Sequence, residues 1–391
     1  MNGTLAIWYE PAAQTDPGSF AAEEQTQAEK PNLELHFNLW RDMPSGTNFL
    51  DIGLKISRAE LLTRIYIYFP VVVRKNQLSD LSEVMKFGQT LNAVFNSVVA
   101  VEKQSDVHYT TLSNGMPFVA VHKISIENDI EIDTVEDGLK GPGSTITFTD
   151  KMCERLWTEK GVDQYIRFRV KLNGKTRHLF TQEVVAKDKI FVSSSHRLEL
   201  TELRLNEHRS FPSSIAKNAQ SNAFVISRVH YFLIRELGNT LVTQHAPLRK
   251  VRRLEANLWA AYLNGAPTVS HDAAEEERLA SRMVIYHWRE GSPKDPIADF
   301  TAFASFQTSA PGLAFYIIAL VLLGAVGSSV SAWGLESYGL QTSLIGFLGG
   351  IALLWLITWS GLWAWLGARF GDVKRSVIRR LRKLRRAVTD L

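Results

Sequence analysis

Apolar and polar side chains alternate with a period of two along much of the first 300 residues, which is the pattern of a half-buried β-strand. The alternation is clear in residues 33–39 and 52–56, and residues 65–69 form a run of β-branched and aromatic side chains that ends at Pro70. Such runs favour strands because these side chains pack well on a pleated surface. The same patterns predict further strands, at residues 117–126, 145–149, 164–172, 198–205 and 223–235.

Helical periodicity is confined to a few segments between the predicted strands. Residues 78–95 show it with one glycine interruption, residues 152–157 form a short stretch, and residues 248–263 end at an Asn-Gly pair typical of a helix C-terminus. Residues 272–288 begin with acidic side chains, which suit a helix N-terminus. A final strand over residues 283–288 is the alternative for that last segment.

Strands and helices do not alternate regularly along the chain, which disfavours a doubly wound nucleotide-binding sheet. We therefore predict an α+β fold, with a β-rich, mainly antiparallel soluble domain over residues 1–290. Residues 10–31 are predicted to form a loop, and a glycine-rich stretch at residues 136–145 marks a point where the domain could divide. Residues 291–311 contain three prolines and are predicted to be a linker.

Two long apolar segments follow this linker. No charged side chain lies within residues 312–333 or 343–366, and Glu336 is the one charge in the connection between them. Each segment exceeds the ~20 residues that a helix needs to cross a bilayer. The sequence therefore predicts a transmembrane helical hairpin over residues 312–366.

The final residues, 367–391, form a basic tail whose apolar positions recur at spacings of three and four, as in an amphipathic helix on an anionic lipid surface. Positive charge stays on the cytoplasmic side of a membrane. The hairpin is therefore predicted to lie in the bacterial inner membrane, with the N-terminal domain and the tail cytoplasmic. The tail side chains expected at the membrane surface are Arg379, Arg380, Arg382, Lys383, Arg385 and Arg386.

Small side chains recur four residues apart within the predicted hairpin. In lipid, small side chains let helix backbones approach closely. They predict close packing, either within one hairpin or between the hairpins of a homo-oligomer. The residues concerned are Gly324, Gly327, Ser328, Ser331, Gly346 and Gly350.

The charge distribution separates the two ends of the chain. Nine of the 44 Lys and Arg residues and three of the 40 Asp and Glu residues follow residue 300, so this end has a net charge of +6. The first 300 residues hold the remaining 35 basic and 37 acidic side chains. A nucleic-acid-binding domain usually concentrates basic charge on its folded part, so nucleic acid is not an expected partner.

No segment carries a catalytic or cofactor-binding signature. No two histidines are four residues apart, and Cys153 is the only cysteine, so the sequence predicts no metal site. Residues Gly174, Lys175 and Thr176 end like a phosphate-binding loop, but Arg169 stands where the first glycine is needed. We therefore expect no enzyme activity, no cofactor and no metal ion.

Three groups of basic side chains are candidates for binding an anion. Four basic residues stand at the start of a predicted helix, where backbone N–H groups favour anions. Arg167 and Arg169 share one face of a predicted strand, and Arg228, His230 and Arg235 are comparable on another. These groups could line a pocket for a small anionic signal, with an exposed basic surface as the alternative for each. The four residues of the first group are Arg249, Lys250, Arg252 and Arg253.

The segments 312–333 and 343–366, with the basic tail, resemble in architecture the two-span membrane effectors of bacterial anti-phage defence. The resemblance implies a cytoplasmic sensor whose hairpins oligomerise and permeabilise or depolarise the membrane. A membrane-tethered scaffold or adaptor for cytoplasmic protein partners is an alternative function, and a membrane-bound enzyme of unrecognised class is another.

Overall fold

The computed structural model describes residues 3–12, 30–42, 48–86, 89–136, 141–184, 196–255 and 281–309, with isolated positions at 259, 262, 263, 278 and 280 and between 317 and 336. The chain divides into two units, Met1–Ala310 and Pro311–Leu391, which are described separately. The first unit contains all the strands described below.

One sheet of ten strands carries the candidate site. The β2–β14 and β8–β11 pairs are parallel, and the other pairs are antiparallel. Nine strands follow one another in hydrogen-bonded order, and β5 pairs with β11 beside this path. In that order the strands are β16 (Lys250–Arg253), β17 (Met283–Glu290), β14 (Val225–Glu236), β2 (Asn32–Trp40), β3 (Asn48–Ser57), β11 (Asp163–Leu172), β8 (Met116–His122), β7 (His108–Ser113) and β6 (Val99–Gln104), with β5 at Leu78–Asp80.

A second sheet of eight strands packs against the first. Its β1–β13 pair is parallel, and its other pairs are antiparallel. The N-terminal strand therefore lies inside the sheet, between β13 and β4. In order the strands are β15 (Asn239–Gln244), β18 (Phe300–Ser309), β13 (His196–Leu205), β1 (Thr4–Pro11), β4 (Leu62–Phe69), β10 (Gly143–Phe148) and β9 (Ile130–Val135), with β12 (Thr181–Val184) beside β13.

The facing sides of the two sheets form the main hydrophobic core. On β2, Leu33, Leu35 and Phe37 are fully buried in this core together with side chains of the other sheet such as Ile67 and Phe148. Successive side chains of a strand point to opposite faces. The alternate residues of β2 therefore point away from the core, to the outer face of the ten-stranded sheet.

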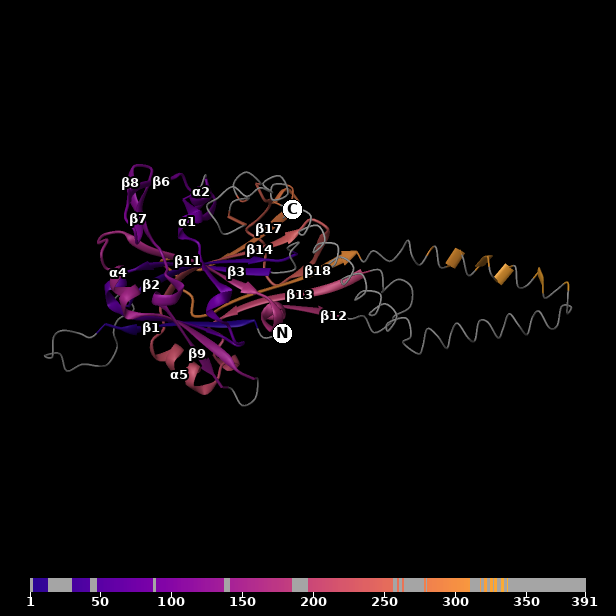
Figure 1. Cartoon of the computed structure of the whole chain (residues 1–391), viewed down its shortest axis with the longest axis horizontal. Coiled ribbons are helices and arrows are strands. Elements are labelled where there is room, and N and C mark those ends of the chain that lie inside the picture. Colours follow the sequence, from indigo (N-terminus) through magenta and orange to yellow (C-terminus); the bar gives the residue numbers. More distant parts are fainter. Residues whose placement is uncertain are drawn as a thin grey trace, which may run out of the picture. The chain divides into compact units, whose positions relative to one another are not determined.

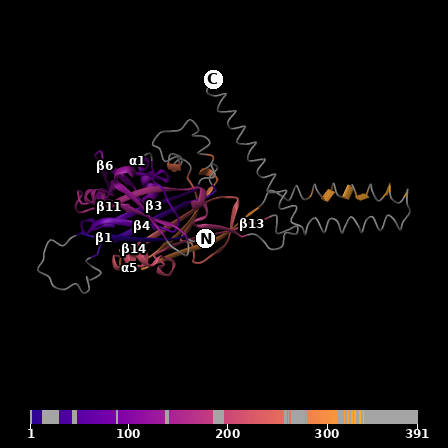
Figure 2. The ribbon, with the colours of Figure 1, turned by 60° about the horizontal axis from the view of Figure 1, so that its bottom comes forward.

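Short helices cover the outer faces of this sandwich (Figures 1 and 2). α1 (Ser82–Met85), α2 (Thr90–Phe95) and the helical positions near Trp259 pack on the ten-stranded sheet in a second cluster around Trp40. On the far side α5 (Ser213–Ser221) packs on the eight-stranded sheet. α3 (Ile126–Asp129) and α4 (Asp150–Arg155) complete the helices, none of which exceeds nine residues in the described part of the chain.

Buried ion pairs join the two sheets through Glu199 of β13. Arg41, which follows β2, donates to Glu199 from Nε (3.3 Å) and Nη2. Arg235 of β14 places Nη1 2.8 Å from the same carboxylate and also pairs with Asp42 at 2.7 Å. Arg235 is 2 % exposed and Glu199 is 9 % exposed. Glu199 thus contacts two buried guanidinium groups inside the sandwich, and Asp42 supplies a second carboxylate to one of them, Arg235.

The predicted α+β fold with a transmembrane hairpin is contradicted. The described residues are mostly in β-strands. Segments whose apolar and polar side chains alternate less clearly than those of β2 also form strands, among them β6, β7, β9, β15 and β18. Within the described positions, no helix is long and apolar enough to span a membrane. This finding overturns the predicted membrane protein, its transmembrane helices and its location in the bacterial inner membrane. The second span, 343–366, and the tail, 367–391, lie outside the described residues.

Several local predictions also require correction. The helix predicted over residues 248–263 begins instead as the edge strand β16, and residues 283–290 form β17, which was the alternative for the last predicted helix. Residues 78–95 contain β5 and two short helices rather than one helix. The predicted linker contains β18, a ten-residue strand paired along its length with β13.

A buried histidine should make the fold sensitive to acid. His122 on β8 is fully buried, with Nε2 2.7 Å from the Gln164 side-chain oxygen, and burial lowers its pKa to about 4. The unfolded chain, with a histidine pKa of about 6.5, binds the proton first as the pH falls. We expect this group to contribute its full stabilisation above pH ~6.5 and to lose about 3 kcal/mol as the pH falls to ~4.

Urea unfolding of the wild type and the His122→Gln variant at several pH values measures this contribution. The free energy of unfolding of the wild type should fall more steeply between pH 6.5 and 4 than that of the variant. Equal pH slopes would show that His122 is not held neutral by burial.

Candidate functional site

The outer face of the ten-stranded sheet carries the candidate site. The alternation of β2 places Glu34, His36 and Asn38 on this face, opposite its buried leucines. On β14, the register to β2 shifts between Ile226 and Arg228. A bulge of this kind changes which face later side chains point to. Ile226 accordingly lies in the sandwich core, whereas Arg228 lines the outer face.

A cavity of about 380 Å³ opens on this face. Its wall is formed by β2, β3, β8, β14, β16, β17 and α2. Among the described residues that line it, Glu34 is the one carboxylate against six cationic side chains. We call it the cationic cavity, after Lys55, Arg228, Arg249, Lys250, Arg252 and Arg289.

Crowding of these cations disfavours further positive charge in the cavity. Burial and the neighbouring charges of His230 and Arg249 lower the pKa of His287 to about 3. Desolvation and the charges of Arg249 and Arg228 also lower the pKa of Arg289. The cavity therefore has a positive potential, which favours an anionic ligand.

Arg167 of β11 lies at the inner end of this face, beside the cationic cavity. Its side chain is 1 % exposed, and Nε and Nη1 donate to the hydroxyls of Tyr262 (2.6 Å) and Tyr165 (2.9 Å). Nη2 has no hydrogen-bond partner among the described residues, and no carboxylate pairs with this guanidinium there. Arg167 lines a small hollow of about 10 Å³ that shares His36 and Arg252 with the larger cavity.

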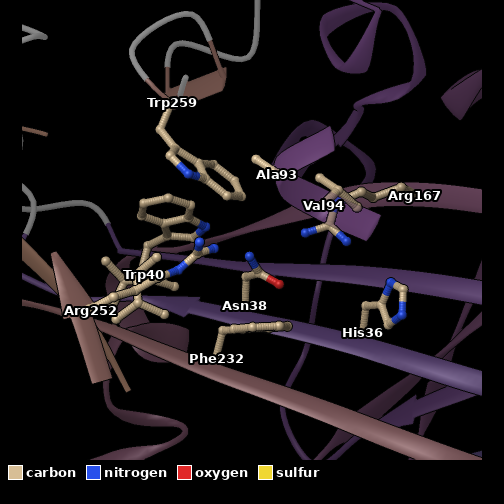
Figure 3. A pocket seen from close by; sticks show the side chains of 11 residues that line it. His36, Asn38, Trp40, Ala93, Val94, Arg167, Phe232, Arg252 and Trp259 are labelled. Atoms are coloured by element: carbon tan, nitrogen blue, oxygen red, sulfur yellow. The ribbon is translucent and has the colours of Figure 1, made fainter. Parts of the chain in front are cut away.

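Figure 3 shows how these side chains converge. His36, Asn38 and Trp40 stand in a row on β2, and Trp259 covers Trp40 from above. The guanidinium groups of Arg167 and Arg252 point toward Asn38 from opposite sides. Arg167 of β11 and Arg252 of β16 thus both face the small hollow beside the cationic cavity.

Arg169, two residues further along β11, has the opposite environment. Its guanidinium donates to both oxygens of Asp51, at 2.7 and 3.0 Å, and to the carbonyl of Leu263 at 2.8 Å. Asp51 is fully buried and also accepts from the Trp40 indole at 2.7 Å. Arg169 is therefore neutralised by a direct ion pair, whereas Arg167 has no carboxylate within ion-pair distance among the described residues and is affected by Asp51 only at longer range.

Gly53 of β3 has no side chain, and the Arg167 guanidinium occupies the space that a side chain at this position would fill. It lies between His36 and Arg167 in the strand register, and a Cβ at this position would contact the Tyr165 hydroxyl and lie 2.9 Å from Arg167 Nη1. Any side chain here would therefore displace the guanidinium.

The Gly53→Ala variant should lower anion affinity by about 10-fold and the free energy of unfolding by about 1–3 kcal/mol, since overpacking shifts buried groups. Titration calorimetry and urea unfolding measure the two effects. Gly238→Ala is the matched control, because no described atom lies within 4 Å of a Cβ at Gly238. Equal affinity in both variants would show that the position of Arg167 does not matter for binding.

Three side chains at the floor of the cavity form a histidine–glutamate cluster, namely Glu34, His36 and His230. Glu34 Oε1 lies 3.3 Å from His36 Nε2 and 3.4 Å from His230 Nε2. His36 Nδ1 is 3.1 Å from the Tyr165 hydroxyl, and His230 Nδ1 is 3.1 Å from His287 Nε2. The Nε2 atoms of both imidazoles thus face the same carboxylate oxygen, Oε1 of Glu34.

Burial and hydrogen bonding set the charges of this cluster. Burial lowers the pKa of His36 to about 4, although Glu34 opposes that shift. Burial alone would raise the pKa of Glu34, but hydrogen bonds with His230 and His36 outweigh it and hold that pKa well below its usual range. His36 is therefore a neutral imidazole beside an ionised carboxylate near pH 7.

The residues predicted from the sequence are only partly brought together. Lys250 and Arg252 line the cavity from the edge strand β16, and Arg249 from the residue before it, rather than from a helix. Arg253 faces away and donates to the Ser281 carbonyl at 2.9 Å, and Arg235 belongs to the ion pairs between the sheets. Cys153 is buried in the core, where burial raises the pKa of its thiol to about 12 and so favours the protonated thiol near pH 7.

The predicted packing and membrane-surface residues remain untested. A Cβ added at Gly324 or Gly327 would have no described atom within 4 Å, and Ser328 is helical and exposed. The other predicted positions lie outside the described residues, namely Ser331, Gly346, Gly350 and the basic residues of the tail.

The sequence reasoning missed part of the site. Lys55, His287 and Arg289 were not singled out, and Glu34 and His36 were treated only as the polar half of an alternating strand. The available signal was the segment Glu34-Leu35-His36-Phe37-Asn38, in which the polar positions are acid, imidazole and amide rather than ordinary surface side chains.

Comparisons with known proteins leave the family open. No family model matches the chain, and no curated protein matches it. Among solved structures, yeast LTA4 hydrolase in complex with bestatin superposes with a TM-score of 0.24 and 7 % sequence identity, over 75 % of this chain. This chain spans only 31 % of that enzyme's length, and a similarity this weak says nothing about function.

Proposed function

We propose that the first unit is a sensor domain that binds a small phosphate-bearing anion in the cationic cavity. The proposal rests on the environment of Arg167. Its guanidinium is buried, its Nη2 has no hydrogen-bond partner, and no carboxylate among the described residues forms an ion pair with it. An uncompensated buried charge is costly, so such a group usually has a partner. Arg167 does not line the cavity itself, so we infer that an anion bound beside His36 and Arg252, which border both the cavity and the hollow of Arg167, supplies that partner.

The surrounding wall fits an organic phosphate better than a simple ion. Six cations and one carboxylate line a volume within the range of small-molecule pockets, which is about 300–1,000 Å³. Phe95, Phe118 and Phe232 also line the cavity. Arginine forks bind phosphate oxygens in pairs, and aromatic side chains offer a surface for a ring or an apolar group. The ligand class is thus a phosphate joined to an aromatic or apolar body.

Titration calorimetry on the full chain tests the proposal, with inorganic phosphate, pyrophosphate and the common nucleoside monophosphates as probes. We expect saturable binding of at least one phosphate compound with a Kd below about 1 mM, and weaker binding at higher salt. The Arg252→Ala variant should bind at least about 10-fold more weakly.

The neighbouring Arg253→Ala variant is the matched control, because Arg253 lies on the same strand but outside the cavity. It should bind like the wild type. No saturable binding by any probe, or equal losses in the Arg252 and Arg253 variants, would contradict the proposed function.

A further inference from the structure

The histidine–glutamate cluster has the composition of a transition-metal site. Two imidazole nitrogens and one carboxylate oxygen are ligands that Zn²⁺ accepts readily, at bond lengths of about 2.0–2.2 Å. The ligand atoms of Glu34, His36 and His230 all lie within 4.8 Å of one another. We propose that these three residues bind a divalent transition-metal ion, with Zn²⁺ as the best fit.

The distances support this assignment. In a tetrahedral site with bonds of about 2.0–2.1 Å, neighbouring ligand atoms lie about 3.3–3.4 Å apart. Glu34 Oε1 lies 3.3 Å from His36 Nε2 and 3.4 Å from His230 Nε2. Both distances from the Glu34 oxygen therefore match a tetrahedral site, and the two histidine nitrogens lie within 4.8 Å of each other.

The backbone holds the ligands in this arrangement. Glu34 and His36 are two residues apart on β2 and point to the same face, and His230 is the register partner of His36 on the adjacent parallel strand β14. All three ligands thus come from the middle of a sheet rather than from a loop. Sites built on such elements have well-defined geometry.

Outer contacts orient both imidazoles for coordination. Metal-bound histidine usually donates its second ring N–H to a neighbouring acceptor. His36 Nδ1 faces the Tyr165 hydroxyl and His230 Nδ1 faces His287 Nε2, each at 3.1 Å. With the ring proton on Nδ1, both Nε2 lone pairs are available to the ion.

Three protein ligands leave a tetrahedral ion with one open position. Glu34, His36 and His230 all line the cavity wall or floor, so this position is reached from the cavity. A water molecule or an anionic oxygen can take it. The metal site itself requires only the three side chains and does not depend on the proposed phosphate ligand.

Tag-free full-length protein, stripped with chelator and free of phosphate, provides the test. We expect Zn²⁺ titration to show one equivalent bound, and Co²⁺ to give the visible absorption of a tetrahedral site with nitrogen and oxygen ligands. Glu34→Gln and His230→Ala should each weaken Zn²⁺ binding by about 100-fold or more. Thermal unfolding of both variants checks that they are folded.

His108→Ala is the matched control. His108 lies in the same sheet, on β7, and also pairs with a glutamate, since its Nε2 is 3.0 Å from Glu159. It should bind Zn²⁺ like the wild type. No stoichiometric binding by the wild type would overturn the metal site, as would wild-type affinity in folded Glu34→Gln and His230→Ala proteins. Phosphate titration of the metal-free protein reports on the proposed function separately.

Discussion

Replacing Arg167 with methionine should weaken phosphate binding by about 100-fold, and the variant should nevertheless be at least as stable as the wild type. The loss follows because Arg167 Nη2 is the buried donor left for a ligand. The stability follows because methionine fills a similar volume and removes a buried charge that has no carboxylate within ion-pair distance in the described part of the chain, where Asp51 acts on it only at longer range. Replacing buried charges by apolar side chains is often neutral, or stabilising by about 1–4 kcal/mol.

Titration calorimetry with the best phosphate probe and urea unfolding of the ligand-free protein give the two quantities. Arg169→Met, two residues along the same strand, is the comparison. It leaves Asp51 buried without its guanidinium partner and should lower the free energy of unfolding by about 3–5 kcal/mol. A strongly destabilised Arg167→Met protein would mean that this arginine serves the fold, and that the proposed ligand site lacks its main support.

The second large effect concerns the carboxylate between the sheets. Glu199→Gln keeps the shape of the side chain but leaves Arg41 and Arg235 with one negative charge fewer. Breaking a buried ion pair in this way costs about 3–5 kcal/mol. At about 2–4 °C per kcal/mol for a domain of this size, Tm should fall by roughly 10 °C.

Thermal and urea unfolding measure this loss, and Glu127→Gln is the control. Glu127 pairs with Lys75 at 3.7 Å, but its side chain is 79 % exposed. Exposed ion pairs contribute about 0–1 kcal/mol, so this variant should unfold like the wild type. Similar stability of the Glu199 and Glu127 variants would show that the ion pairs around Glu199 do not hold the sheets together.

Strands in which apolar and polar side chains alternate strongly could be predicted from the sequence. Strands that form only because a neighbouring strand pairs with them could not. The alternation in residues 33–39 and 52–56 predicts β2 and β3, because within these segments one face of each strand is wholly apolar. β16 has four residues, all but one of them basic, and is a strand only because β17 pairs with it. β18 was missed because its mixture of small, aromatic and polar side chains has no clean period.

The candidate site shows the same division. Basic residues at 249–252 could be identified as anion-binding candidates, since their charge is visible in the sequence. That Arg167 is buried without a carboxylate while Arg169 has one depends on Asp51, which lies more than 100 positions earlier and meets Arg169 only through strand pairing. The approach of His230 to His36 likewise depends on a parallel pairing between β2 and β14.

The position of β1 has a consequence for how the chain is made. β1 is synthesised before the other described strands, but it pairs with β13 in the register Thr4↔Arg204, about 200 residues later. At about 5–20 residues per second, one edge of β1 waits for roughly 10–40 s on the ribosome before its partner exists. An unpaired, apolar strand edge readily joins other chains. Early protection by a chaperone, rather than the stability of the finished sandwich, should therefore limit the yield of folded protein during rapid expression.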